Sequence, residues 1–569
     1  MPSINKHWQI SPPIPPEAGQ NLLGYPPILR QILFNRGYHT HEAARQFLEA
    51  LPPQGTEPGN MLGVPQAVER IQFALSQGEK IAVYGDYDAD GVTATALLTQ
   101  VLRSLGGDVI GYIPNRFDEG YGLNIEALDT LQQDGIQLVV TVDCGIRSPR
   151  ETEHARQAGL DLIITDHHHP GAEMPAALAV INPKQPGENY PDQDLAGVGL
   201  AYKLAQALLE VAPPDSTIPE VHQYLDLVAL GTIADLAPLV GENRALVRAG
   251  LGQIRRPHRQ GLMSLIGAAG LNPEKISATD IGFMLGPRLN AAGRLESALA
   301  ALRLLTTEDV AEAAGLAQKL DNQNRERQQI TREIQSDAEK LALADDPNAM
   351  LLFAAHPEYN PGVVGLAASR LTEQYYRPAI VAHLGEEFTR GSCRSIPEFH
   401  ITNALDQVAD LLVHHGGHAA AAGFTVRNQD LPAMIERMKA IAQQALGHLD
   451  LRPVLRADIE IPLSDLHPSL LEDLAWLQPT GQSNPEAVFV SRGLRVVRFR
   501  AVGRENAHLR LSVSDGRITY DAIAFRQGHW QAQMPPHVDL LYSFETNEYN
   551  GRSSLQLNVR DLKPSGADD

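Results

Sequence analysis

Three aspartates alternate along a short stretch of the chain, Asp86, Asp88 and Asp90, directly after the apolar run 81–83. Carboxylates this close repel one another, and burying them without compensation is costly. A divalent cation would supply the missing positive charge. Because ligands of open α/β sheets gather at the carboxyl ends of the strands, this stretch predicts a metal site at the top of a sheet.

Aspartates at this spacing have three other interpretations. An EF-hand loop needs a bidentate Glu at its twelfth position, but Leu97 stands there. It also needs a helix before the loop, whereas the preceding segment is strand-like. The EF-hand is therefore rejected. The stretch also resembles the signature of haloacid-dehalogenase-like phosphatases, with Asp88 as nucleophile and Asp90 as acid. This segment alone does not exclude that class. A solvated acidic turn is the purely structural alternative.

Two further apolar, β-branched runs end in Asp or His. The first leads to Asp143, and the second leads to Asp166, His167 and His168. The segment between them, 147–159, has a helical pattern, so a βαβ unit is expected and the tips of its parallel strands should converge. Carboxylates combined with imidazole suit Mn²⁺, Mg²⁺ or Zn²⁺ better than Ca²⁺.

A fourth apolar stretch, 226–239, carries Asp235 near its end and is stopped by Pro238. Taken alone, Asp235 would more often be a cap than a ligand. Together with the other three clusters, a ligand role is favoured.

The four clusters, in this order, resemble the motif series of the DHH phosphoesterase superfamily. The segments 288–294 (RLNAAGR), 391–395 (GSCRS) and 416–424 (GGHAAAAGF) narrow the resemblance to the RecJ family of single-stranded-DNA-specific exonucleases. It runs from about residue 8 to about residue 560. The dehalogenase-like interpretation is displaced, because it has no place for the histidines.

The resemblance implies two divalent ions, Mn²⁺ or Mg²⁺, at the strand tips, where a bound water of lowered pKa would attack a terminal phosphodiester. Asp143 is expected to bridge the ions and, with His168, to be catalytic. The expected metal ligands are Asp86, Asp88, Asp90, Asp143, His167 and Asp235. The expected substrate-binding residues are Arg288, Asn290, Arg294, Ser369, Arg370, Ser392, Arg394 and His418.

Patterning and resemblance together predict an α/β protein with a parallel-sheet DHH domain, a second α/β DHH-associated domain joined by a long helix, and an OB-like β-barrel at the C-terminal end. A polar helix without Gly or Pro at its centre usually bridges domains. Five short strands after 490 favour the barrel. The expected segments are 1–55 (N-terminal segment), 56–300 (DHH domain), 301–345 (linker helix), 346–447 (DHH-associated substrate domain) and 448–569 (OB fold).

Net charge is −21 over 569 residues, which at first argues against a nucleic-acid ligand. The stretch 491–510, however, contains six arginines and one acid. A local cationic groove can coexist with an acidic body. Arg495, Arg498 and Arg500 are therefore the expected DNA-binding residues.

The two cysteines, Cys144 and Cys393, cannot build a disulfide framework and suit the cytoplasm, and no run is apolar enough to act as a signal or to span a membrane. We expect a monomeric enzyme, a 5′-to-3′ exonuclease that degrades single-stranded DNA to mononucleotides in DNA repair and recombination. A helicase and a single-strand-binding protein are candidate partners. The alternatives are a DHH phosphodiesterase for short oligonucleotides or cyclic dinucleotides, and a catalytically inactive DNA-binding scaffold.

Overall fold

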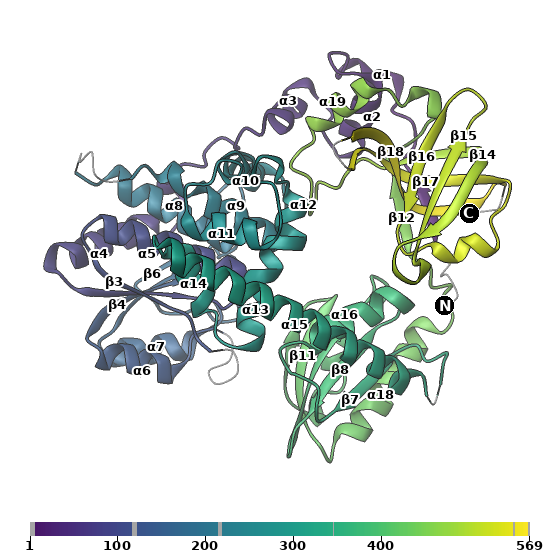
Figure 1. The fold of residues 1–569 in the computed structure, drawn as a ribbon. Coiled ribbons are helices and arrows are strands. Elements are labelled where there is room, and N and C mark those ends of the chain that lie inside the picture. Colours follow the sequence, from purple (N-terminus) through teal and green to yellow (C-terminus); the bar gives the residue numbers. More distant parts are fainter. Residues whose placement is uncertain (1–5, 116–121, 214–218, 345, 550–551, 567–569) are drawn as a thin grey trace. The chain divides into compact units, whose positions relative to one another are not determined.

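The computed structural model in Figure 1 describes residues 6–566 except 116–121, 214–218, 345 and 550–551. The chain divides into two compact units. The larger unit contains Gln9–Asp321 and Arg456–Asp569, and the smaller unit contains Met1–Trp8 and Asn322–Leu455. The predicted fold class is confirmed, because a parallel sheet, a mixed sheet and a C-terminal barrel are all present.

The larger unit is built around a parallel sheet in the order β3-β2-β4-β5-β6. Its strands are β2 (Lys80–Gly85), β3 (Asp108–Tyr112), β4 (Ile136–Val142), β5 (Asp161–Thr165) and β6 (Ala179–Ile181). The central strands are buried along almost their whole length, as both-sided coverage of a parallel sheet requires. Side chains alternate between two cores: Ile81 and Val83 pack on one face, Ala82 and Tyr84 on the other.

Helices cover both faces of this sheet, as Figure 1 shows for α4 and α5 on one side and α6 and α7 on the other. The bounds are α4 (Val64–Gln77), α5 (Ala89–Ser104), α6 (Ile125–Gln133) and α7 (Pro149–Gln157). The α4–α5 side is thickened by an all-helical layer. Its members are α8 (Gly197–Glu210), α9 (Leu225–Ala234), α10 (Gly241–Ile254), α11 (Gln260–Ala268), α12 (Ala278–Asp280), a π-helical turn (Ile281–Leu285), α13 (Gly286–Leu295) and α14 (Leu299–Thr306).

The predicted long helix is present as α15 (Val310–Leu343), but it begins about nine residues later than expected, because a separate helix, α14, precedes it. After α14 the chain turns, and α15 begins where the Asp309 side chain accepts a hydrogen bond from the Glu312 backbone N–H at 2.7 Å. That capping interaction competes with a continuous helix. α15 is also less uniformly polar than expected, because Ala313, Ala317 and Leu320 join the core of the larger unit.

The smaller unit contains a five-stranded mixed sheet in the order β10-β11-β9-β8-β7, in which only β7 and β8 are parallel. Its strands are β7 (Leu352–His356), β8 (Ala379–Leu384), β9 (Phe388–Arg394), β10 (Leu412–Gly417) and β11 (Ala421–Arg427). Its helices are α16 (Val364–Tyr375), α17 (Ile401–Asp406) and α18 (Leu431–Leu446).

The C-terminal strands form a barrel, because β14 pairs with β15 on one side and with β17 on the other. The strands are β14 (Phe489–Val502), β15 (His508–Ser514), β16 (Thr519–Ala524), β17 (His537–Tyr549) and β18 (Arg552–Pro564), with the short β13 (Ile459–Glu460) beside β14. Helices α2 (Pro27–Asn35), α3 (His41–Glu49) and α19 (Pro468–Ala475) share one hydrophobic core with this barrel. The N-terminal helices therefore belong with the end of the chain. The short helix α1 (Pro16–Gln20) precedes them, and β1 (His7–Ile10) pairs with β12 (Val454–Ala457).

One buried arginine ties the helical layer to this C-terminal region. Arg244 on α10 is 1% exposed and donates five hydrogen bonds to backbone carbonyls, those of Phe47 and of Trp476, Leu477, Gln478 and Pro479. Its guanidinium also lies 4.1 Å from the centre of the Phe47 ring. Burial lowers the pKa of Arg244 to about 10, which leaves the group charged at neutral pH.

Both cysteines are buried free thiols, as expected for small core residues. None of the helices in the described ranges combines the length and the hydropathy needed to cross a lipid bilayer.

Candidate metal centre

The loop between β2 and α5 positions the three alternating aspartates. Asp88 is the N-cap of α5, and its Oδ1 accepts the backbone N–H groups of Asp90 at 2.9 Å and Gly91 at 3.1 Å. Aspartate is favoured at this position because it satisfies donors that the helix leaves free. A Cβ at Gly91 would lie 2.5 Å from the backbone N of Asp86, so glycine lets the loop fold back on the helix.

Asp143 follows β4 in a strained backbone conformation. Its φ is +64°, in the left-handed region, and its backbone N–H donates to the Thr165 carbonyl at 3.0 Å. Such a conformation costs about 1–3 kcal/mol and concentrates at functional sites, although Asp tolerates it better than most residues. The first turn of α8 lies against this side chain, since a Cβ at Gly197 would be 2.7 Å from the Asp143 Cβ.

The helical layer supplies the remaining carboxylate and anchors Asp90. The Asp90 carboxylate accepts the backbone N–H groups of Gly197 at 2.7 Å and Val198 at 2.8 Å, at the N-terminus of α8. Asp235 caps the C-terminal end of α9 and precedes Leu236, which has a positive φ of 62°. The apolar stretch before Asp235 is thus a buried helix.

These groups converge around His167. Its Nε2 lies 3.1 Å from Asp143 Oδ1, 3.8 Å from Asp235 Oδ2 and 4.0 Å from Asp90 Oδ2. Three sets of potential ligands have their donor atoms within 4.8 Å of one another: Asp86, Asp88 and Asp143; Asp90, His167 and Asp235; and Asp143, His167 and His168. All six side chains predicted as metal ligands therefore meet in one place, with Asp143 common to two of the sets.

The potential ligand atoms are better satisfied by a bound cation than by contacts with one another. Asp143 Oδ1 and His167 Nε2 are both buried, and neither has a hydrogen-bond partner among the described residues. An unsatisfied buried polar atom costs about 1–3 kcal/mol, so its retention points to a ligand. The mixed oxygen and nitrogen set suits Mn²⁺ or Mg²⁺.

The electrostatics support the same conclusion. Burial, reinforced by the charge of Asp88, raises the pKa of Asp90 to about 7. Burial and the charge of Asp90 raise the pKa of Asp235 to about 9, and burial among carboxylates raises that of Asp143 well above its usual value. Burial lowers the pKa of His167 to about 3. A cation would reverse each of the carboxyl shifts by favouring the anionic carboxylates, and it would bind the neutral imidazole that burial already favours.

Asp166 follows a strand just as Asp143 does, but the sequence pattern assigned it no ligand or catalytic role. Its Oδ1 lies 2.7 Å from His168 Nδ1 and accepts the His168 backbone N–H at 3.0 Å, and its Oδ2 accepts the N–H of Ile146. Burial alone would lower the pKa of His168, but the hydrogen bond and charge of Asp166 raise it to about 9. His168 is therefore an imidazolium beside the carboxylates.

Lys184 also lies beside the site. Its Nζ donates to the His167 carbonyl at 2.8 Å, and Asn182 donates to the His168 carbonyl at 2.9 Å. Both residues follow β6, so they fix the histidine pair from the neighbouring strand. Their sequence carries no acid cluster that would have marked them.

The predicted substrate-binding residues of the larger unit lie on α13. Asn290 Oδ1 accepts the backbone N–H of Ala89 at 2.7 Å and so holds the aspartate loop. Arg288 is nearly buried and pairs with Asp321, with its Nη2 at 2.9 Å from Asp321 Oδ1. Arg294 lies further along the same helix. A phosphate-binding role for these arginines stays a prediction.

In the smaller unit, the structure brings four predicted substrate-binding residues near the first turns of α16. Ser369 and Arg370 lie on the helix, while Ser392 and Arg394 lie on β9. A Cβ at Gly365 would be 2.8 Å from Ser392 Oγ and 3.1 Å from Arg394 Nη2, which shows how closely the strand approaches the helix. His418 follows β10 and is exposed.

The three predicted DNA-binding arginines, Arg495, Arg498 and Arg500, are exposed on β14. Arg498 Nη2 pairs with Asp521 Oδ1 at 3.0 Å, and Arg510 reaches the same carboxylate at 3.3 Å. Part of the positive charge of this strand is thus neutralised within the barrel.

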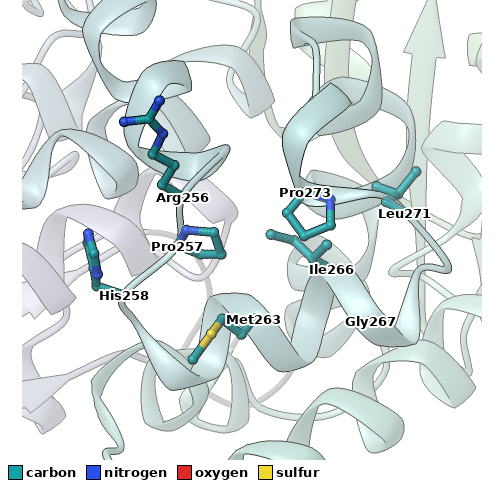
Figure 2. A pocket seen from close by; sticks show the side chains of 8 residues that line it. All are labelled: Arg256, Pro257, His258, Met263, Ile266, Gly267, Leu271 and Pro273. Atoms are coloured by element: carbon teal, nitrogen blue, oxygen red, sulfur yellow. The ribbon is translucent and has the colours of Figure 1, made fainter.

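A separate hollow of about 520 Å³ lies beside α11 (Figure 2). It is lined mainly by apolar side chains, including Met263, Ile266 and Leu271, with Arg256 and His258 among its polar members. None of the described residues that line it is a carboxylate or a member of the metal centre.

Three segments of the chain match known protein families. Residues 80–232 match the DHH family N-terminal domain, 348–444 match the DHHA1 domain, and 457–561 match the RecJ OB domain.

Whole-chain relatives give the same result. The single-stranded-DNA-specific exonuclease RecJ of Bacillus subtilis is 38% identical over 95% of this chain and 68% of its own length. The Escherichia coli protein of the same name is 36% identical over 95% and 96%. The crystal structure of RecJ in complex with Mn²⁺ from Thermus thermophilus superposes with a TM-score of 0.85 at 33% identity, covering 99% of this chain and 80% of that one. This chain belongs to the RecJ family of the DHH superfamily.

Proposed function

We propose that this protein is a metal-dependent exonuclease that degrades single-stranded DNA from the 5′ end to mononucleotides. The observation that carries the proposal is the meeting of the three ligand sets on Asp143 and His167, whose buried Oδ1 and Nε2 atoms have no hydrogen-bond partner among the described residues. Relatives at 36–38% identity are named single-stranded-DNA-specific exonucleases, and related structures contain Mn²⁺ or Mg²⁺.

The chain's own residues prepare the site for two cations. Asp143 shares one set with Asp86 and Asp88 and a second with His167 and His168, and His167 also shares a set with Asp90 and Asp235. Asp86 and Asp88 would therefore hold one cation and Asp90, His167 and Asp235 the other, with Asp143 shared between them. Divalent cations bound there would supply a water of lowered pKa and neutralise charge on the phosphoryl oxygens. The Asp166–His168 pair holds an imidazolium that can stabilise a phosphoryl oxygen or donate a proton to the leaving oxygen.

The proposal is tested with labelled strands. Metal-free protein is incubated with 5′- and 3′-labelled single- and double-stranded DNA, with and without Mn²⁺ or Mg²⁺. We expect mononucleotide release from the 5′ end of single strands only, abolished by EDTA and by Asp143→Ala, while strand binding by that variant survives.

Other outcomes select a rival function. Hydrolysis of dinucleotides or cyclic dinucleotides but not of long strands would indicate a short-substrate phosphodiesterase. Strand binding without metal-stimulated hydrolysis would indicate an inactive scaffold. Release of label from the 3′ end first would overturn the polarity.

We further propose that the β14 arginines bind the DNA backbone. Replacing Arg495, Arg498 and Arg500 with alanine should weaken strand binding and flatten its salt dependence. About 0.7 per phosphate contact is lost from the slope for single strands. Because Arg498 is already paired with Asp521, we expect the slope to fall by the amount for about two phosphate contacts and not for three. An unchanged slope would remove these residues from the DNA-binding surface.

The compartment we propose is the cytoplasm, since both thiols are free and buried. We propose a monomer, testable by light scattering during gel filtration, and a helicase and a single-strand-binding protein as partners, testable by pull-down with the purified proteins.

A further inference from the structure

A cationic cluster in the smaller unit is not used by the metal centre. It begins on α15 with Arg327, whose Nη2 donates to Asn324 Oδ1 at 2.9 Å. The Nε of Arg327 is buried and has no hydrogen-bond partner among the described residues, and no described carboxylate lies within ion-pairing distance of its guanidinium. A desolvated guanidinium held only by a neutral amide is poorly compensated.

A second guanidinium, that of Arg370, lies on α16. The two helices lie side by side, because Gln374 on α16 bonds both Gln335 and Glu339 of α15 at 3.0 Å. Arg327 and Arg370 stand earlier on these two helices. Burial lowers the pKa of Arg327, and the charge of Arg370 lowers it further. Arg370 has only a long contact of 3.9 Å to the exposed carboxylate of Glu373 among the described residues.

The Gln323 side-chain amide lies on the same side of α15 and makes no hydrogen bond to the described residues. It lies four residues before Arg327, so the two side chains neighbour each other on the helix surface. Gln323 is only 6% exposed, yet its Oε1 and Nε2 are both buried without a hydrogen-bond partner in the described part of the chain. A packing role would favour an apolar side chain here, since leaving a buried amide unsatisfied is costly.

We propose that Gln323, Arg327 and Arg370 form a phosphate-binding subsite that holds a backbone phosphate of a single-stranded nucleic acid. The two guanidiniums repel each other, and no acid lies between them in the described structure. An anion that accepts hydrogen bonds from both would compensate this repulsion. The Gln323 amide donates to the same group. That the anion is part of a strand rests on the proposed exonuclease function. Arg370 is already among the residues expected to bind substrate, and so are Ser392 and Arg394, which approach the first turn of α16. The proposal adds Gln323 and Arg327 on α15 to that set.

The test measures strand binding in EDTA, where no hydrolysis occurs, with a fluorescent oligothymidylate over a series of salt concentrations. Arg327→Ala and Arg370→Ala should each weaken binding about tenfold or more and reduce the salt slope by about 0.7. Arg332→Ala is the matched control, because it removes an exposed arginine from the same helix. Its affinity and slope should equal those of the wild type.

Gln323→Leu separates ligand binding from packing. An amide kept for a ligand predicts weaker binding with an equal or higher melting temperature, because the buried unsatisfied group is removed. The subsite would be overturned if Arg327→Ala and Arg370→Ala showed the same salt slope of strand binding as Arg332→Ala. It would also be overturned if Gln323→Leu melted at a higher temperature and bound the strand like the wild type. Neither result would affect the Mn²⁺-dependent hydrolysis by the wild type. A wild type that neither binds nor hydrolyses the strand would overturn the proposed function, and the subsite with it.

Discussion

Replacing Asp143 with Asn should stabilise the metal-free protein at neutral and alkaline pH while destroying its metal response. Asp143 is buried, and the charges of Asp90, Asp88, Asp86 and Asp235 add to the effect of burial on its pKa. Asn removes the charge but keeps the shape, and it tolerates the positive φ of this position. Asp143 Oδ1 has no described hydrogen-bond partner, so little bonding is lost.

The size of the gain follows from linkage. A carboxyl whose pKa is raised on folding holds its proton at pH values where the unfolded chain has lost it, so stability falls as pH rises above the ordinary value of 3.8. At pH 8 this penalty cannot exceed about 6 kcal/mol, the free energy of about four pH units. One carboxylate neighbour whose oxygen lies within 4.8 Å contributes about 3 kcal/mol or more at an effective dielectric constant of about 20. We therefore expect Asn to add about 3 to 6 kcal/mol near pH 8 and almost nothing near pH 4.

The assay is thermal melting of the full chain in EDTA from about pH 4 to about pH 8.5, repeated with Mn²⁺. A gain of about 3 kcal/mol corresponds to a rise of about 6 °C or more for a large domain. Asp108→Asn, an exposed aspartate on β3, is the matched control and should change nothing. With Mn²⁺ the order reverses, because cation binding stabilises the wild type but not the variant.

A variant that melts lower than the wild type in EDTA at pH 8 would refute this reasoning. It would mean that the Asp143 carboxylate stabilises the protein through contacts of its own, and that the cluster is compensated without a cation. A stability gain independent of pH would equally contradict a raised pKa.

Three further predictions concern two residues that support the metal centre and one buried arginine that supports the fold. Asp166→Asn should lower the pKa of His168 from about 9 toward its ordinary 6.5, so the alkaline limb of the pH–rate profile should move to lower pH; an unmoved limb would separate the imidazolium from the reaction. Asn290→Ala should slow hydrolysis at least about tenfold with a loss of only about 1 kcal/mol in stability, because it releases the aspartate loop without opening the core; an unchanged rate would contradict this. Arg244→Met should lower the free energy of unfolding by about 3–5 kcal/mol, and with it the melting temperature, because five backbone carbonyls lose their hydrogen-bond donor. Arg256→Met, which removes an exposed arginine, is the control. Equal melting temperatures of the two variants would be inconsistent with a structural role for Arg244.

Much of this site could be predicted because its chemistry is local in sequence. Acidic and imidazole residues directly after apolar strands identify the tips of a parallel sheet, and the βαβ rhythm says that those tips adjoin. The order of the clusters then indicates the family. Asp166 carries the same signal, but its hydrogen bond to His168 is not visible in the sequence.

What the sequence could not provide depends on packing between distant segments. Asp90 is anchored by the N-terminus of α8, and Asp235 reaches the site from a buried helix whose uniformly apolar pattern resembles that of a strand. Likewise, nothing near Arg244 or Gln323 distinguishes a buried side chain from a solvated one. Those assignments require knowledge of which backbone carbonyls or helices lie opposite.

The most direct test of the metal centre is a titration of metal-free protein with Mn²⁺ followed by electron paramagnetic resonance. We expect the wild type to take up two ions per chain and Asp143→Asn to lose at least one of them, in parallel with loss of single-strand hydrolysis. Equal Mn²⁺ uptake by both proteins would show that the gathered carboxylates and imidazole are not the binding site.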